Sequence, residues 1–136
     1  MRFQAVLLGV LCSASLSAWT PDDMLKVKTV SDVQVSPDGH DVAFTVTRHD
    51  LVKSEPVSQV WVARADGVTH REFQLTQGAY QASSPRWSPD GRWIVFGAMV
   101  DASGGAFVVS SEGGTPRRLT APSVSALVFG WSRDGK

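Results

Sequence analysis

Apolar residues from Val33 onward come in short runs rich in β-branched and aromatic side chains, separated by segments rich in Gly, Pro, Asp and Ser. Runs of this kind, bounded by turn residues, predict β-strands. In the run at 93–96, Trp-Ile-Val-Phe, both alternating positions are apolar. A strand with one face in water would alternate with polar residues, so this run predicts a strand that is covered on both faces.

The predicted strands form a repeat with four strands per unit. In the first unit they lie at 33–35, 42–46, 59–63 and 72–76, with a polar loop at 49–56; in the second they lie at 86–87, 93–96, 106–109 and 117–120. A third unit opens with an apolar run at 127–131 and reaches Lys136 directly after its turn.

A turn motif joins the first two strands of each unit. It reads Ser-Pro-Asp-Gly at 36–39 and 88–91 and Ser-Arg-Asp-Gly at 132–135, at intervals of 52 and 44 residues. Proline presets the backbone for the second position of a type I turn, and glycine reaches the left-handed conformation that follows. Two further landmarks keep the 44-residue interval: the pairs Leu75-Thr76 and Leu119-Thr120, and the residues Trp87 and Trp131.

Four short antiparallel strands per repeat are typical of a β-propeller blade. We therefore predict an all-β fold, a partial β-propeller with two four-stranded antiparallel blades, at about 31–77 and 83–121, and the first hairpin of a third blade at 125–136. Closed rings have about four to eight blades, so we expect the chain to be the N-terminal fragment of a longer protein. Expressed alone, it should leave one blade face bare and self-associate.

The first 18 residues differ from the rest of the chain. Arg2 precedes an apolar run at 5–12 and a segment of mostly small residues, a pattern that predicts a secretory signal peptide cleaved near Ala18. The chain would then be periplasmic or secreted, with no membrane contact after cleavage. A membrane anchor is disfavoured because the run is shorter than a membrane span, and a lipoprotein site at Cys12 because a large residue precedes it.

A short helix is expected at 19–30, between the signal peptide and the first blade. Thr20 suits the N-cap, Pro21 suits the first helical position, and the carboxylates of Asp22 and Asp23 favour the positive end of the helix dipole.

Composition limits the possible partners. The chain is 43% hydrophobic and 19% charged, and its 13 basic and 13 acidic residues give a formal net charge of zero. Because the basic residues form no stripe, a nucleic-acid surface is not expected.

Cys12 is the single cysteine and lies in the predicted signal peptide, so the mature chain would carry no disulfide.

Motifs for catalysis or metal binding are missing from the sequence: it has no Gly-x-Ser-x-Gly, no His-Glu-x-x-His and no paired cysteines. We therefore assign no catalytic, cofactor-binding or metal-binding residue. We interpret the residues that could carry chemistry as structural. We expect solvated loop side chains at His40, His49 and His70, and turn residues that bind backbone amides at Asp38, Asp90 and Asp134. We expect core packing of Trp61, Trp87, Trp93 and Trp131, and turn glycines at Gly104, Gly105, Gly113 and Gly114.

Several segments resemble the mature start of secreted bacterial prolyl oligopeptidase-family peptidases of the acylaminoacyl-peptidase type. They are Trp-Thr-Pro-Asp-Asp-Met-Leu at 19–25, Val-Ser-Asp-Val-Gln-Val-Ser-Pro-Asp-Gly at 30–39, Asp-Val-Ala-Phe at 41–44, Gln-Val-Trp-Val at 59–62 and Ser-Pro-Arg-Trp-Ser-Pro-Asp-Gly at 84–91. The resemblance implies a propeller that caps a C-terminal α/β-hydrolase domain, which carries a Ser-Asp-His triad and cleaves short peptides. Every member of that triad would lie beyond Lys136, so no catalytic residue is transferred to this chain.

Two other functions fit the repeats. One is a non-enzymatic periplasmic propeller of the TolB type, which binds other proteins; in that family a separate domain precedes the propeller, whereas here only about a dozen residues follow the predicted cleavage site. The other is a different enzyme, such as a lyase or an amidohydrolase, fused to a propeller.

Overall fold

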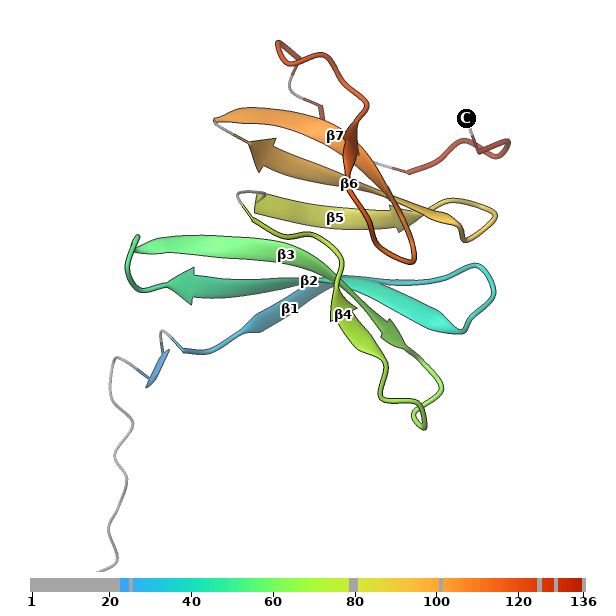
Figure 1. Ribbon diagram of the computed structural model, residues 1–136, viewed down its shortest axis with the longest axis horizontal. Helices are drawn as coiled ribbons and strands as arrows, with labels where there is room; N and C mark the ends of the chain where they lie inside the picture. Colours follow the sequence, from blue (N-terminus) through green and yellow to red (C-terminus); the bar gives the residue numbers. More distant parts are fainter. Residues whose placement is uncertain are drawn as a thin grey trace, which may run out of the picture.

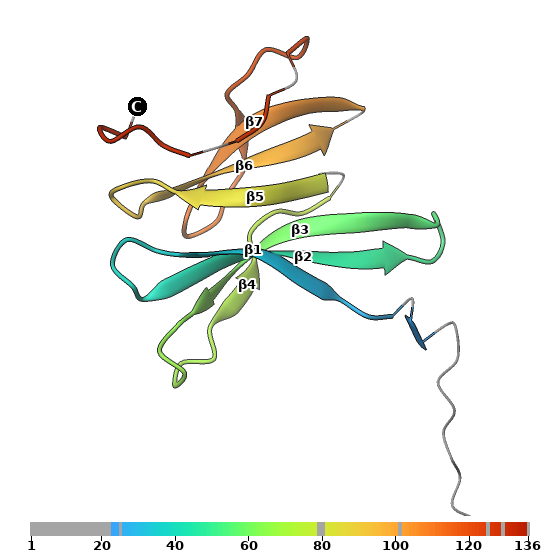
Figure 2. The same ribbon diagram turned by 180° about the vertical axis from the view of Figure 1, so that it is seen from behind.

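The protein is represented by a computed structural model, which describes residues 23–24, 26–78, 81–100, 102–124, 126–128 and 130–135. Two antiparallel four-stranded sheets lie side by side, each with its strands in chain order (Figures 1 and 2). The first sheet contains β1 (Thr29–Val35), β2 (Asp41–Asp50), β3 (Glu55–Arg64) and β4 (Glu72–Gln74); the second contains β5 (Gln81–Trp87), β6 (Trp93–Val100), β7 (Ser103–Ser110) and β8 (Arg117–Arg118). The predicted all-β fold of four-stranded blades is confirmed.

The core lies between the two sheets. It contains Ala43, Val60, Val62 and Leu75 from the first sheet and its last turn, and Ala82, Ile94, Phe96, Ala98, Phe107 and Val109 from the second. Phe96 and Phe107 face each other across β6 and β7 with ring centroids 5.8 Å apart, and Phe96 is fully buried. Burial of these alternate positions is what holds one sheet against the next.

One face of the first sheet has no sheet packed on it among the described residues. Phe44 and Trp61 pair across β2 and β3 on this face, and both are only half-buried. Their equivalents in the second sheet, Phe96 and Phe107, are buried against the first sheet. The repeat thus gives the first sheet an apolar face of the kind that receives a neighbouring blade, and Trp61 lies on this flank instead of in the core, contrary to our prediction.

The strands extend further than the apolar runs suggested. The segment predicted as a polar loop at 49–56 continues the β2–β3 ladder, which pairs residues up to Asp50 and Glu55, so only residues 51–54 form the turn. Polar residues such as His49 do not end the hairpin, because its backbone hydrogen bonds need no apolar side chains.

Both first strands contain the same irregularity. Pairing of β1 shifts between Ser31 and Gln34, and pairing of β5 shifts between Ser83 and Arg86. Asp32 and Ser84, within these bulges, have φ angles of 51° and 55°. A bulge bends a strand and increases its twist, so the two blades reproduce one local backbone shape from different residues.

The third unit forms its turn but not its predicted strand. The amide of Gly135 donates to the Ser132 carbonyl over 3.0 Å, yet residues 126–128 and 130–131 are in no strand. A β-strand needs a partner to satisfy its backbone groups, and the described residues offer none to this segment. The predicted first hairpin of a third blade is therefore present only as a turn.

Most of the predicted N-terminal segments, including the signal peptide at 1–18 and Thr20 to Asp22, lie outside the described residues. Asp23 and Met24 are helical, and the amide of Lys26 donates to the Asp23 carbonyl over 3.2 Å. The predicted boundary at residue 30 is too late, because β1 already begins at Thr29. In the part of the chain that is described, no helix has both the length and the apolar character needed to cross a membrane.

Replacing Thr45 with valine is expected to raise the free energy of unfolding by about 1 kcal/mol, because a buried hydroxyl without a partner is costly. The Thr45 side chain is 2% exposed in the core, and its Oγ1 has no hydrogen-bond partner. Urea unfolding measures the change. Thr47→Val is the matched control on the same strand, since the Thr47 hydroxyl bonds to Ser58 Oγ over 2.9 Å and its loss should not stabilise the chain. A lower stability of Thr45→Val than of the parent would contradict the assignment.

Candidate functional site

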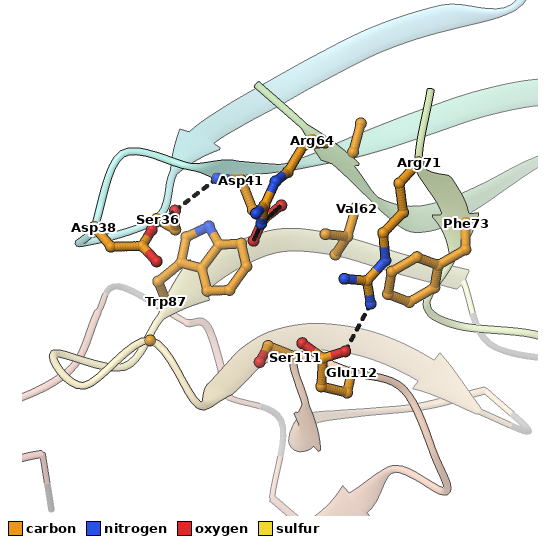
Figure 3. Close-up of a pocket in the computed structure, with 12 residues that line it drawn as sticks. Ser36, Asp38, Asp41, Val62, Arg64, Arg71, Phe73, Trp87, Ser111 and Glu112 are labelled. Carbon is orange, nitrogen blue, oxygen red and sulfur yellow. Dashed lines mark hydrogen bonds and ion pairs between the residues drawn. The ribbon is translucent and has the colours of Figure 1, made fainter. Parts of the chain in front are cut away.

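A cavity of about 210 Å³ opens in the seam between the two sheets (Figure 3). Its walls come from the turn after β1, the start of β2, the end of β3, the start of β4, the end of β5 with the turn that follows, and the turn after β7. Val62, Phe73 and Trp87 form its apolar side, and the remaining lining is largely polar and charged. The cavity therefore exists only because two neighbouring blades meet.

The indole of Trp87 ties the second blade to the first. Its Nε1 donates to the backbone carbonyl of Gln34 over 3.0 Å, in the bulge of β1. The indole of Trp131 does the same one unit later, donating to the Arg86 carbonyl in the bulge of β5 over 3.0 Å. A buried indole needs a hydrogen-bond acceptor, and the bulges supply it at both seams. Trp87 also packs against the core, as predicted, whereas Trp131 is half-buried and is not part of the core cluster.

Val35 occupies the position that corresponds to Trp87 in the first unit, and its side chain is 61% exposed. This position of the first unit therefore has no indole to form such a bond. Trp93 is also no core residue, since it is 45% exposed where it begins β6. Core packing is thus wrong for Trp61 and Trp93.

Two ion pairs line the cavity. Arg64 Nη1 lies 3.3 Å from both carboxylate oxygens of Asp41, within the first blade. Arg71 Nη2 lies 2.6 Å from Glu112 Oε2 and so bridges the two blades, while its guanidinium lies 5.5 Å from the centre of the Phe73 ring (Figure 3). The hydrogen bond and the charge of Glu112 raise the pKa of Arg71 above its usual value. Both members of this pair are well exposed, so water screens the attraction and the pair adds little stability.

The turn motif acts through a small hydrogen-bond network. In the second unit, the Ser88 hydroxyl donates to Asp90 over 2.6 Å and accepts from the Trp93 amide over 2.9 Å, and Asp90 accepts from the Arg92 amide over 3.1 Å. The first unit repeats these bonds with Ser36 and Asp38, and in the third Ser132 donates to Asp134 over 2.6 Å. The prediction that Asp38 and Asp90 bind backbone amides is confirmed.

Acid is expected to weaken the turn of the second unit. The Ser88 hydroxyl, then the Arg92 side chain and amide, lower the pKa of Asp90 to about 2. An aspartate with an unfolded-state pKa of about 3.9 and a lower folded-state pKa stabilises the fold above pH 4, and this contribution is lost as the pH falls towards 2. A titration of the Asp90 carboxyl carbon by NMR should give a midpoint near 2, and Ser88→Ala should raise it. A midpoint near 3.9 in both proteins would contradict the network.

The three histidines are exposed and contribute nothing to the cavity. His40 directly follows the first turn, and His70 lies in the loop before β4, as predicted, but His49 belongs to β2. No group of three His, Cys, Asp or Glu side chains among the residues with described positions could hold a metal ion.

The glycine pairs differ from each other. Gly113 and Gly114 have φ angles of 99° and 124° in the turn after β7, as expected for turn glycines. Gly104 and Gly105 instead lie inside β7, which corrects our prediction. A Cβ at Gly105 would be 2.7 Å from Thr120 Oγ1, so the position needs glycine because a side chain and backbone approach closely there.

The charged residues of the cavity were not among the candidates from sequence. Asp41 and Arg64 are 23 residues apart, and Arg71 and Glu112 are 41 apart, so no local pattern could pair them. Asp41 and Arg64 pair within the first blade, so only the Arg71–Glu112 pair fits a role in joining blades.

The chain is similar to two peptidases over most of its length. The uncharacterized peptidase YuxL of Bacillus subtilis (strain 168) is 32% identical over 120 residues, which are 86% of this chain and 18% of the relative. Dipeptidyl-peptidase 5 of Porphyromonas endodontalis is 25% identical over 120 residues, which are 88% of this chain and 17% of the relative. The chain thus spans less than a fifth of the length of these curated relatives. No family model matches it.

Solved structures share the fold. The AtxE2 isopeptidase in its apo form has a TM-score of 0.71 at 20% identity and covers 83% of this chain and 22% of its own. The β-propeller domain of the trilobed protease from Pyrococcus furiosus has a TM-score of 0.60 at 20% identity, with coverages of 82% and 32%. TolB from Acinetobacter baumannii has a TM-score of 0.58 at 18% identity, with coverages of 80% and 25%. These likenesses establish that the two sheets are propeller blades.

Proposed function

We propose that this chain is the N-terminal propeller part of a secreted or periplasmic serine peptidase. Its sequence and fold are those of a propeller fragment that resembles the prolyl oligopeptidase family. The propeller would cap a C-terminal α/β-hydrolase domain and restrict its active site to short peptides. The triad of that domain would lie outside the 136 residues, and the propeller would contribute no catalytic group.

The observation that carries this proposal is the 32% identity to a peptidase along a chain that is built as repeated blades. The match covers less than a fifth of that peptidase, which agrees with a propeller segment joined to further domains. The free apolar flank of the first sheet, with Phe44 and Trp61, agrees with a ring that contains further blades, as does the third unit, whose described residues form a turn but no strand. The predicted signal peptide at 1–18 supports export.

Expression of the complete reading frame tests the proposal. We expect its product to react with a fluorophosphonate probe, which labels activated serines, and to hydrolyse aminoacyl or dipeptidyl p-nitroanilides. Replacement of the serine in the downstream Gly-x-Ser-x-Gly motif by alanine is the matched control and should abolish both signals. Capping predicts a second result: short peptides should be cleaved and a folded protein should not.

A TolB-type binding propeller is the second candidate, favoured by the structural likeness to TolB from Acinetobacter baumannii. A complete product without probe labelling or peptidase activity, but with a stable envelope-protein partner, would support this function and contradict the first. A downstream lyase or amidohydrolase domain would contradict both.

A further inference from the structure

The β2–β3 hairpin is longer than its counterpart in the second blade. Phe44 pairs with Trp61 and the equivalent Phe96 pairs with Phe107, so 16 residues lie between the first pair and 10 between the second. The six additional residues lengthen the hairpin at its closed end, where residues 51–54 form the turn. Neither sheet needs this extension to complete its four strands.

The tip of this hairpin is an ordered turn that presents apolar side chains. Asp50 Oδ1 accepts from the amides of Val52 and Lys53 over 3.0 and 3.2 Å and so fixes the backbone. Leu51 is 54% exposed and Val52 is 95% exposed, the highest value among the large apolar side chains of the described residues. Asp66 fixes the β3–β4 turn in the same way, through the amides of Val68 and Thr69, but that turn exposes a single large apolar side chain. The β2–β3 tip differs because it exposes two adjacent ones, which makes it the better candidate for a contact surface.

The tip projects at the end of the sheets opposite the three Ser-x-Asp-Gly turns (Figures 1 and 2). The chain enters β1 at this end, where the shorter β6–β7 hairpin also closes. Met99, on β6 near the closed end of that second hairpin, is 48% exposed. At the opposite end, the serine and aspartate side chains of the turns bond to each other and to nearby amides, which leaves them less free to bind a partner.

We propose that Leu51 and Val52 dock the propeller onto the catalytic domain, an inference that rests on the proposed function. More than four fifths of the length of the curated relatives lies outside the matched segment. In a protein of that length, the two blades would contact a large further part of the same chain. The free face of the first sheet is of the kind that packs against another blade. A different domain would therefore contact one of the two ends of the ring. Of the two ends, this one carries the longer extension: the β2–β3 hairpin is six residues longer than its counterpart, whereas the β3–β4 connection is only two residues longer than the β7–β8 connection.

Hydroxyl-radical footprinting tests the docking, because oxidation of a side chain follows its exposure to water. The complete gene product is compared with the 136-residue chain. Oxidation of Leu51 and Val52 should be several-fold slower in the complete product. Val68, which is 81% exposed in the β3–β4 loop, is the matched control and should be oxidised equally in both.

A product that shows peptidase activity but oxidises Leu51 and Val52 as fast as the short chain would overturn the docking and leave the proposed function intact. A product without a hydrolase domain would overturn both. Protection that increases with protein concentration would indicate a second copy as the partner and would also overturn the inference. As a second readout, the double variant Leu51→Ser/Val52→Ser should lower the melting temperature of the complete product, whereas Val68→Ser should not.

Discussion

Replacing Phe96 with alanine is expected to lower the free energy of unfolding by about 3 to 5 kcal/mol, the usual cost of removing a buried aromatic ring. The Phe96 ring has no exposed surface, stacks on Phe107 and lies in the core between the two sheets. Its loss would leave a cavity where one blade meets the next. Urea unfolding followed by tryptophan fluorescence measures the change.

Trp93→Ala is the control for this prediction. Trp93 begins the same strand but is 45% exposed, so its removal should cost about 1 kcal/mol. Equal losses in the two variants would mean that the interface between the sheets is not the core of the fold. Because net stabilities of folded proteins are only about 5 to 15 kcal/mol, the loss in Phe96→Ala would be a large part of the total.

Replacing Thr76 with valine is expected to cost about 2 to 3 kcal/mol, because it removes a buried hydrogen-bond acceptor and donor at nearly constant volume. The Thr76 side chain is fully buried; its hydroxyl accepts from the Val60 amide over 3.0 Å and donates to Gln59 Oε1 over 2.6 Å. The Leu75 amide donates to the Val60 carbonyl over 2.8 Å, so the Leu-Thr pair continues the sheet beyond β4.

Thr120→Val provides a matched control in the second blade. The Thr120 hydroxyl accepts from the Ala106 amide over a longer distance, 3.3 Å, and the residue is only half-buried. Water can replace this hydroxyl in part, so the loss should be about 1 kcal/mol or less. A larger loss in Thr120→Val than in Thr76→Val would contradict the role assigned to the Leu-Thr pair.

The repeat made the blades predictable from sequence. Ser36 to Gly39 and Ser88 to Gly91 recur with the same turn chemistry, and the network around Asp38 and Asp90 needs only residues within five positions of each other. Local chemistry of this kind is visible in one sequence. The Leu-Thr pairs gave the interval, although their hydrogen bonds to Val60 and Ala106 depend on strand pairing.

The seam could not be predicted in the same way. Trp87 reaches the Gln34 carbonyl, 53 residues earlier in the sequence, only after the second sheet docks on the first. The ion pair of Arg71 and Glu112 arises for the same reason. Trp61 was predicted to pack in the core because it lies on a strand of the repeat, but a sheet that would cover it does not occur among the described residues.

The nucleotide sequence past codon 136 tests the central claim most directly. If the two sheets are blades of a closed propeller, the complete protein should contain about four to eight blades. Further Ser-x-Asp-Gly turns should then follow at intervals close to the 52 and 44 residues of this chain. A Gly-x-Ser-x-Gly motif between a predicted strand and a helix should come after them. A stop codon shortly after codon 136 in several independent clones, with no further blade encoded, would contradict the account.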